Sequence, residues 1–293
     1  MAELEPAATK SQPPKTNNQQ TSSDSEFAVK FWGVRAKVAT PGKNTIRYGG
    51  NTACITMQAG ETFLIFDSGT GVRKLGNSLL SQMPVKAYMF FTHCHWDRIQ
   101  GFPFFVPAFI PGNSFHIYGA MAANGSSFED RLQEQMSQPN FPVPIGVMQS
   151  ELKFYSIDED GKYCLGDITV ETIPLNYAHR SVAYRVNWQG HSAVCATDIP
   201  YSSDNPSPNL IHLANQADLL ILNAPKFLPG TEQSAWHNLV SIAKETEIKK
   251  LILSMYSPEQ NDDLLDKMKD KIQSVFPNAV LACEGMSLSV IDF

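Results

Sequence analysis

One short segment constrains the fold of this chain more than any other: an apolar run that ends directly in a cluster of metal-binding residue types. Residues 85–92 (VKAYMFFT) are predicted to form a buried strand, and His93, His95 and Asp97 follow it at once. Side chains two apart in an extended chain point to the same side, so His93 and His95 are expected to face one point. Imidazole and carboxylate groups at this spacing suit zinc, iron or manganese. They also suit a hydrogen-bonded polar cavity without metal.

The pattern of apolar residues elsewhere predicts groups of strands with helices between them. This grouping favours stacked helix and sheet layers in one domain. Residues 99–114, rich in Phe, Pro and Gly, are predicted to be a packed loop. Strands are predicted at 27–33, in two runs joined at Gly60-Glu61, and at 85–92, 151–155, 168–173, 182–187, 191–197, 218–223, 251–255, 279–283 and 287–293. Helices are predicted at 72–80, 128–136, 209–215, 235–245 and 261–275.

Composition narrows the class of protein. Residues 1–26 are polar and rich in Pro, Ser, Asn and Gln, so they are predicted to be a disordered tail before a single domain at 27–293. A net charge of -6 argues against extended nucleic-acid binding. The five cysteines form no CxxC pair, and no apolar run is long enough to span a membrane. We therefore expect a cytoplasmic protein with reduced thiols and no membrane association.

Several motifs, strung in order along the chain, resemble those of the metallo-β-lactamase-fold hydrolases, in their phosphodiesterase and ribonuclease Z-like branch. The resemblance implies an α+β, four-layer αβ/βα sandwich with a dinuclear metal site at one edge, between the two sheets. It also makes a homodimer possible. The matching segments are FWGVRAKVATPGKNTIRYGGNTACI, FDSGTGVRKLG, THCHWDRIQGFPFF, LNYAHRSVAYRV, CATDIP and LILSMYSPE.

Four positions of the resembled metal site keep residues that can bind metal. His93 and His95 match two ligands of the first site, Asp97 matches a ligand of the second, and Asp198 matches the bridging aspartate. The resemblance thus implies that His93, His95 and Asp198 hold one divalent ion at most, either zinc, iron or manganese. The alternative is that no metal is bound.

Three ligand positions of the resembled site have lost their histidines. Arg98, Tyr177 and Met255 stand there, and His179, two residues beyond Tyr177, is a displaced candidate. A guanidinium has no lone pair for a metal and stays charged, while a thioether disfavours zinc. We expect the second metal site to be empty and Arg98 to pair with Asp97 or Asp198.

These losses lead to two principal hypotheses. The first is a pseudoenzyme whose cavity, with Arg98, Tyr177, His179 and Met255 as ligand-binding residues, binds a phosphate-containing small molecule or a protein partner. The second is a phosphodiesterase that uses one metal with His93, His95, Asp97 and Asp198, with Asp97 as the catalytic candidate. A scaffold acting through the tail is a third possibility. The aromatic residues of the cluster are predicted to be core rather than base-stacking, namely Trp96, Phe102, Phe104 and Phe105.

Overall fold

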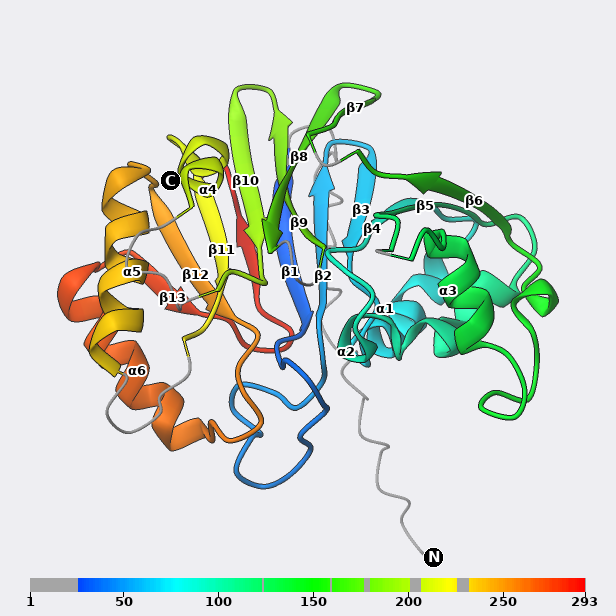
Figure 1. The fold of residues 1–293 in the computed structure, drawn as a ribbon, viewed down its shortest axis with the longest axis horizontal. Helices are drawn as coiled ribbons and strands as arrows, with labels where there is room; N and C mark the ends of the chain where they lie inside the picture. The colour runs from blue at the N-terminus through cyan, green and yellow to red at the C-terminus, as the bar shows by residue number, and fades with distance from the viewer. Residues whose placement is uncertain are drawn as a thin grey trace, which may run out of the picture.

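The computed structural model describes residues 26–122, 124–158, 160–176, 180–200, 207–225 and 232–292. The predicted disordered tail, apart from Glu26, lies outside these ranges. The described residues form two seven-stranded sheets that face each other, with helices on the outer side of each (Figure 1). This is the four-layer αβ/βα sandwich that the sequence motifs predict.

The first sheet is antiparallel toward one edge and parallel toward the other. Strands β14, β1, β2 and β3 pair antiparallel, whereas β3 to β6 pair parallel. In spatial order its strands are β14 (Ser287–Ser289), β1 (Phe27–Gly33), β2 (Cys54–Ala59), β3 (Thr62–Phe66), β4 (Lys86–Phe90), β5 (Ser114–Gly119) and β6 (Glu151–Ser156).

The second sheet has the same mixed construction. Strands β7 to β10 pair antiparallel and β10 to β13 parallel. The parallel strands β11 and β12 are nearly continuous apolar runs because both of their faces are covered. In spatial order the strands are β13 (Ala279–Leu281), β12 (Lys250–Ser254), β11 (Leu219–Asn223), β10 (His191–Ala196), β9 (Ser181–Trp188), β8 (Ile168–Asn176) and β7 (Lys162–Leu165).

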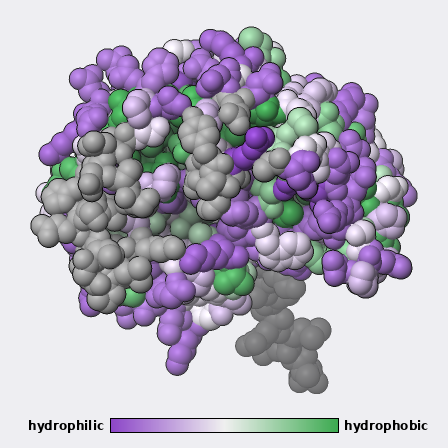
Figure 2. All heavy atoms as spheres, viewed as in Figure 1, coloured by the Kyte–Doolittle hydropathy of each residue, from purple (hydrophilic) through white to green (hydrophobic). Residues whose placement is uncertain are grey.

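Helices close the two outer faces. On the side of the first sheet lie α1 (Val72–Leu79), α2 (Trp96–Ile99) and α3 (Phe128–Gln135), with short 3-10 turns at Leu80–Gln82, Phe102–Phe104, Val106–Phe109 and Ile145–Val147. On the side of the second sheet lie α4 (Pro208–Ala214), α5 (Glu232–Glu245) and α6 (Asp262–Val275) (Figure 1). One apolar cluster fills the space between the sheets and beneath α4 to α6, and a second lies beneath α1 to α3. On the face seen in Figure 2, hydrophilic side chains predominate among the described residues.

Two strands and part of the predicted core depart from the sequence expectations. Strands β5 and β7 were not predicted; β5 begins at the end of the segment expected to be a packed loop. Phe102 and Phe105 are fully buried, as predicted. Trp96 and Phe104 are 60% and 55% exposed, so their prediction as core residues was wrong. Trp96 is the first residue of the single-turn helix α2, whose other three residues take the buried positions.

Candidate functional site

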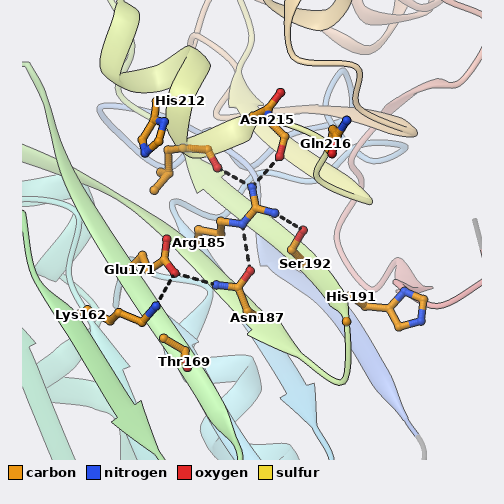
Figure 3. Close-up of a pocket in the computed structure, with 12 residues that line it drawn as sticks. Lys162, Thr169, Glu171, Arg185, Asn187, His191, Ser192, His212, Asn215 and Gln216 are labelled. Carbon is orange, nitrogen blue, oxygen red and sulfur yellow. Dashed lines mark hydrogen bonds and ion pairs between the residues drawn. The ribbon is translucent and has the colours of Figure 1, made fainter.

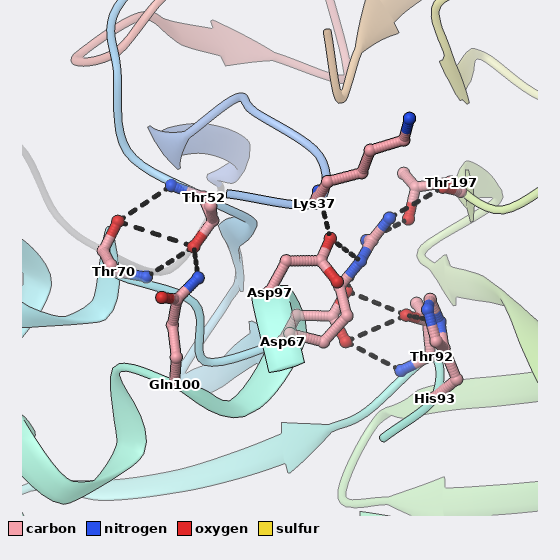
Figure 4. Close-up of polar contacts among 10 residues, drawn as sticks. Lys37, Thr52, Asp67, Thr70, Thr92, His93, Asp97, Gln100 and Thr197 are labelled. Atoms are coloured by element: carbon pink, nitrogen blue, oxygen red, sulfur yellow. Dashed lines mark hydrogen bonds and ion pairs between the residues drawn. The ribbon is translucent and has the colours of Figure 1, made fainter. Parts of the chain in front are cut away.

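The candidate site lies where strands of both sheets end. Asp67 follows β3, Thr92 and His93 follow β4, and Thr197 follows β10. The short helix α2 crosses between these strand ends and carries Asp97 and Arg98 (Figure 4). Carboxyl ends of neighbouring parallel strands meet at one edge of a sheet, which is a common place for ligand sites in α/β proteins. The local topology therefore gathers residues that are distant in sequence.

A tight turn after β3 holds α2 in place. Asp67 has a left-handed backbone (φ 58), and its amide donates to the Phe90 carbonyl at 3.0 Å. Ser68 N–H donates to the Arg98 carbonyl at 2.7 Å, and Gly101 N–H donates to the Ser68 carbonyl at 2.9 Å. These bonds fix the helix backbone, and with it the direction of the Arg98 side chain.

A reciprocal pair of threonines secures the far end of the same turn. Thr52 N–H donates to Thr70 Oγ1 and Thr70 N–H donates to Thr52 Oγ1, both at 2.8 Å. The Gln100 amide donates to Thr52 Oγ1 at 3.0 Å (Figure 4). Gly69 is needed here because an added Cβ would lie 2.4 Å from the Asp97 carbonyl oxygen. The turn and α2 are thus packed without space between them.

Arg98 is buried and bound on three sides by protein groups. Its Nη1 donates to Asp67 Oδ2 at 2.8 Å and to Thr197 Oγ1 at 2.9 Å, and its Nη2 donates to the Thr197 carbonyl at 3.0 Å. Its Nε lies 3.3 Å from Asp97 Oδ2. The side chains of Arg98 and Asp67 are each 3% exposed. The guanidinium therefore joins the two sheets at the centre of the site.

Electrostatics keep this guanidinium charged. Burial by itself lowers the pKa of Arg98, but the charges of Asp67, Asp97 and Asp198 outweigh it and raise that pKa. Burial raises the pKa of Asp67, and Arg98 and the Thr92 hydrogen bonds oppose that rise. The predicted pairing of Arg98 with Asp97 is confirmed. Its shortest contact with a carboxylate, however, is with Asp67, which the sequence did not indicate.

His93, His95 and Asp97 form a compact group of possible metal ligands. One ligand atom from each lies within 4.8 Å of the others. The two imidazole rings have centroids 4.5 Å apart and stand nearly perpendicular. His93 and Asp97 are buried, while His95 is exposed, so the group opens to solvent on the His95 side.

Hydrogen bonding selects the tautomer of His93. Thr92 Oγ1 lies 3.0 and 2.9 Å from the two carboxylate oxygens of Asp67, and 3.1 Å from His93 Nδ1. We assign the single hydroxyl proton of Thr92 to the Asp67 carboxylate, so that His93 Nδ1 carries a hydrogen and donates to Thr92. Nε2 is then the His93 nitrogen with a lone pair for a metal. A ligating histidine held in this way by its other nitrogen is the usual arrangement in metal sites.

The group formed by His93, His95 and Asp97 offers donors for one metal ion. His93, His95 and Asp97 supply three donors, the number that protein side chains commonly give to a catalytic zinc. Asp97 is held from behind, because the Lys37 amide donates to its Oδ2 at 2.9 Å. A second ion next to Asp97 would have to displace the Arg98 guanidinium, which has no lone pair and repels a cation.

The remaining predicted site residues lie outside the group of three ligands or outside the described part of the chain. Asp198 lies two residues after β10, outside the group formed by His93, His95 and Asp97, so its role as a ligand stays a prediction. Met255 is 3% exposed and follows β12 with a left-handed backbone (φ 53). Its role in ligand binding also stays a prediction, as does that of Arg98. Tyr177 and His179 lie outside the described residues.

Three cationic residues lie on segments that are hydrogen-bonded to residues 92–97. Lys37 follows β1 and has an exposed side chain. Arg131 on α3 donates to the sulfur of Cys94, which lies between the two histidines. Arg180, just before β9, is exposed, and its Nη1 lies 3.5 Å from the Met121 carbonyl at the end of β5.

Comparison with solved structures identifies the fold of this chain. No family model matches the chain, and no curated protein matches it. Among solved structures, the metallo-β-lactamase-fold protein YhfI from Bacillus subtilis matches with a TM-score of 0.64 and 20% identity, over 89% of this chain and 99% of YhfI. A diphosphatase of the PhnP family matches with a TM-score of 0.65 and 17% identity, over 90% and 97% of the two chains. The short form of human tRNase Z matches with 0.60 and 17%, over 90% and 99%.

This chain therefore has the metallo-β-lactamase fold, as its sequence motifs predict. At identities of 20% or less, what these proteins share with the chain is the architecture of the two sheets and their helices. Within the part of the chain that the structure describes, no helix is long and apolar enough to cross a bilayer.

Proposed function

We propose that this protein binds a phosphate-bearing ligand at the shared carboxyl edge of its sheets and does not carry out two-metal hydrolysis. One observation supports this most strongly: the Arg98 guanidinium is fixed at the centre of the site by Asp67, Thr197 and Asp97. A metal pair acts by clamping both the attacking and the leaving oxygens, and the second ion has no place beside that guanidinium. The fold is kept while the two-metal chemistry is lost.

The ligand class is inferred from charge. Lys37 and Arg131 are hydrogen-bonded to Asp97 and Cys94, and Arg180 precedes the segment that is bonded to Thr92; arginine and lysine are the usual partners of phosphate oxygens. An acidic surface of a protein partner would be drawn to the same three residues.

A second candidate function is favoured by the geometry of His93, His95 and Asp97. These donors suit a single zinc, iron or manganese ion. Such an ion, when bound, would supply a nucleophilic hydroxide at neutral pH. In that case His93 would be oriented through its Nδ1–H by Thr92, and Asp97 by the Lys37 amide. The protein would then be a one-metal phosphodiesterase.

One experiment separates the two functions. Purified protein is incubated with bis(p-nitrophenyl) phosphate and with zinc, iron(II) or manganese in turn, and p-nitrophenolate release is followed. Our proposal predicts no release above that of the metal alone, together with saturable binding of inorganic phosphate that weakens in Lys37→Ala/Arg180→Ala. Metal-dependent turnover that disappears in His95→Ala would instead establish the one-metal hydrolase.

A further inference from the structure

A second polar cavity lies on the helix-bearing face of the second sheet. It has a volume of about 630 Å³ and is bounded by strands β7 to β10 and by the end of α4 (Figure 3). None of its lining residues belongs to the site formed by His93, His95 and Asp97. It is large enough for a small metabolite.

The floor of this cavity is a chain of hydrogen bonds that crosses four strands. Lys162 Nζ lies 3.2 Å from Glu171 Oε1, and the Asn187 amide donates to the same oxygen at 3.3 Å. Arg185 Nε donates to Asn187 Oδ1 at 2.9 Å, and its Nη2 donates to Ser192 Oγ at 2.9 Å (Figure 3). A row of polar side chains on a sheet face beneath a helix is unusual, since that face normally supplies apolar core.

Arg185 is a half-buried cation whose direct partners are neutral. Besides Asn187 and Ser192, its Nη1 donates to the carbonyls of Leu213 and Asn215 at 2.7 and 2.8 Å, at the end of α4. No carboxylate among the described residues lies within ion-pair distance of its guanidinium. Burial lowers the pKa of Arg185, and the more distant Glu171 and Asp218 only partly oppose that effect. The protein thus holds a positive charge here without a direct counter-charge.

Further groups around the cavity can donate to an anion. Lys162 and His212 are exposed at its rim, and the half-buried His191 ring lies apart from them on β10, with its Nδ1 3.5 Å from Asp218 Oδ2 (Figure 3). Among the described lining residues Glu171 is the one carboxylate, against the two permanent cations Lys162 and Arg185. The balance of charge in the cavity is therefore positive, although the whole chain is acidic.

We propose that this cavity binds a small phosphate-bearing molecule, independently of the site at His93, His95 and Asp97. Lys162 and His212 contact the phosphate group from the rim. Arg185 supplies charge from the floor while it also holds the end of α4.

Histidine-ring NMR of the full chain tests the proposal, because each site has its own reporters. Inorganic phosphate is titrated at fixed pH and ionic strength, and the ring signals are assigned by single His→Ala variants. We expect saturable shifts of the His191 and His212 signals with one shared Kd. That Kd rises about ten-fold in Lys162→Ala and is unchanged in Lys86→Ala, an exposed lysine on the other sheet.

The outcomes separate this cavity from the proposed function. Unchanged His191 and His212 signals overturn the cavity proposal, even if His93 and His95 respond. Shifts that survive Lys162→Ala with the same Kd overturn it as well. Shifts of His191 and His212 with no response of His93 or His95 support the cavity and count against phosphate binding at the first site.

Discussion

Removing the Arg98 charge is the perturbation with the largest effect that the structure predicts. In Arg98→Met, a side chain of comparable length keeps much of the packing while Asp67 loses its cation. At an effective dielectric constant of about 20, two unit charges 2.8 Å apart attract by about 6 kcal/mol. That figure exceeds the expected loss of folding free energy, because the Asp67 carboxylate can take up a proton and become neutral.

Protonation sets the upper limit of the loss. A carboxyl group with an unfolded-state pKa of about 3.9 costs about 4 kcal/mol to protonate at pH 7. The expected destabilisation is therefore about 3–4 kcal/mol, within the roughly 3–5 kcal/mol usual for a broken buried ion pair. Burial raises the pKa of Asp67, and the variant lacks the Arg98 charge that opposes this rise, so the loss is largest at neutral pH. The loss of stability becomes smaller by about 1.4 kcal/mol for each unit by which the pH is lowered toward the unfolded-state pKa of Asp67.

Urea unfolding of Arg98→Met and the unmodified protein at pH 5, 6 and 7 measures this loss. Arg47→Met is the matched control, since Arg47 also pairs with two aspartates but its side chain is 54% exposed. That control should change the free energy of unfolding by less than about 1 kcal/mol. A loss below 1 kcal/mol for Arg98→Met, or one that does not change with pH, would refute the description of Arg98 as the buried partner of Asp67.

Two further predictions concern backbone packing and a second ion pair. Gly69→Ala should destabilise the protein by roughly 1–3 kcal/mol, because the added Cβ would meet the Asp97 carbonyl oxygen. Gly42→Ala is the control and should leave the stability unchanged, since nothing lies close to an added Cβ there. Chemical denaturation measures the free energy of unfolding of both variants. Burial opposes ionisation of Asp218, but the hydrogen bond and charge of Lys249 hold the pKa of Asp218 below its usual value. Asp218→Asn should therefore lose stability at neutral pH, and the difference should disappear as the pH falls through the folded-state pKa; an equal loss at all pH values would contradict this.

The sequence predicted the layers of the fold because their signals are local. Apolar runs such as those of β11 and β12, and the alternating pattern of β1, report directly on burial. Strand β5 was missed because Ser114–Gly119 follows a Phe- and Pro-rich segment and mixes polar with apolar residues. Its neighbours β4 and β6 pair with it in parallel, a non-local interaction that periodicity does not report.

The sequence predicted most residues of the candidate site but not the contact between Asp67 and Arg98. His93, His95, Asp97 and Arg98 are adjacent in sequence, so their gathering could be foreseen. Asp67 was not, because its contact with Arg98 joins residues 31 positions apart through a left-handed turn. The FDSGTG segment was the available signal, since an aspartate before a glycine-rich turn at a strand end is well placed for such a contact.

The metal content of the protein tests the central claim most directly. Protein purified without chelator and loaded with zinc, iron or manganese is analysed by inductively coupled plasma mass spectrometry, beside His95→Ala. Our account predicts at most one equivalent of metal per chain, lost in His95→Ala, because the Arg98 guanidinium stands where a second ion would bind. Two equivalents per chain would contradict it.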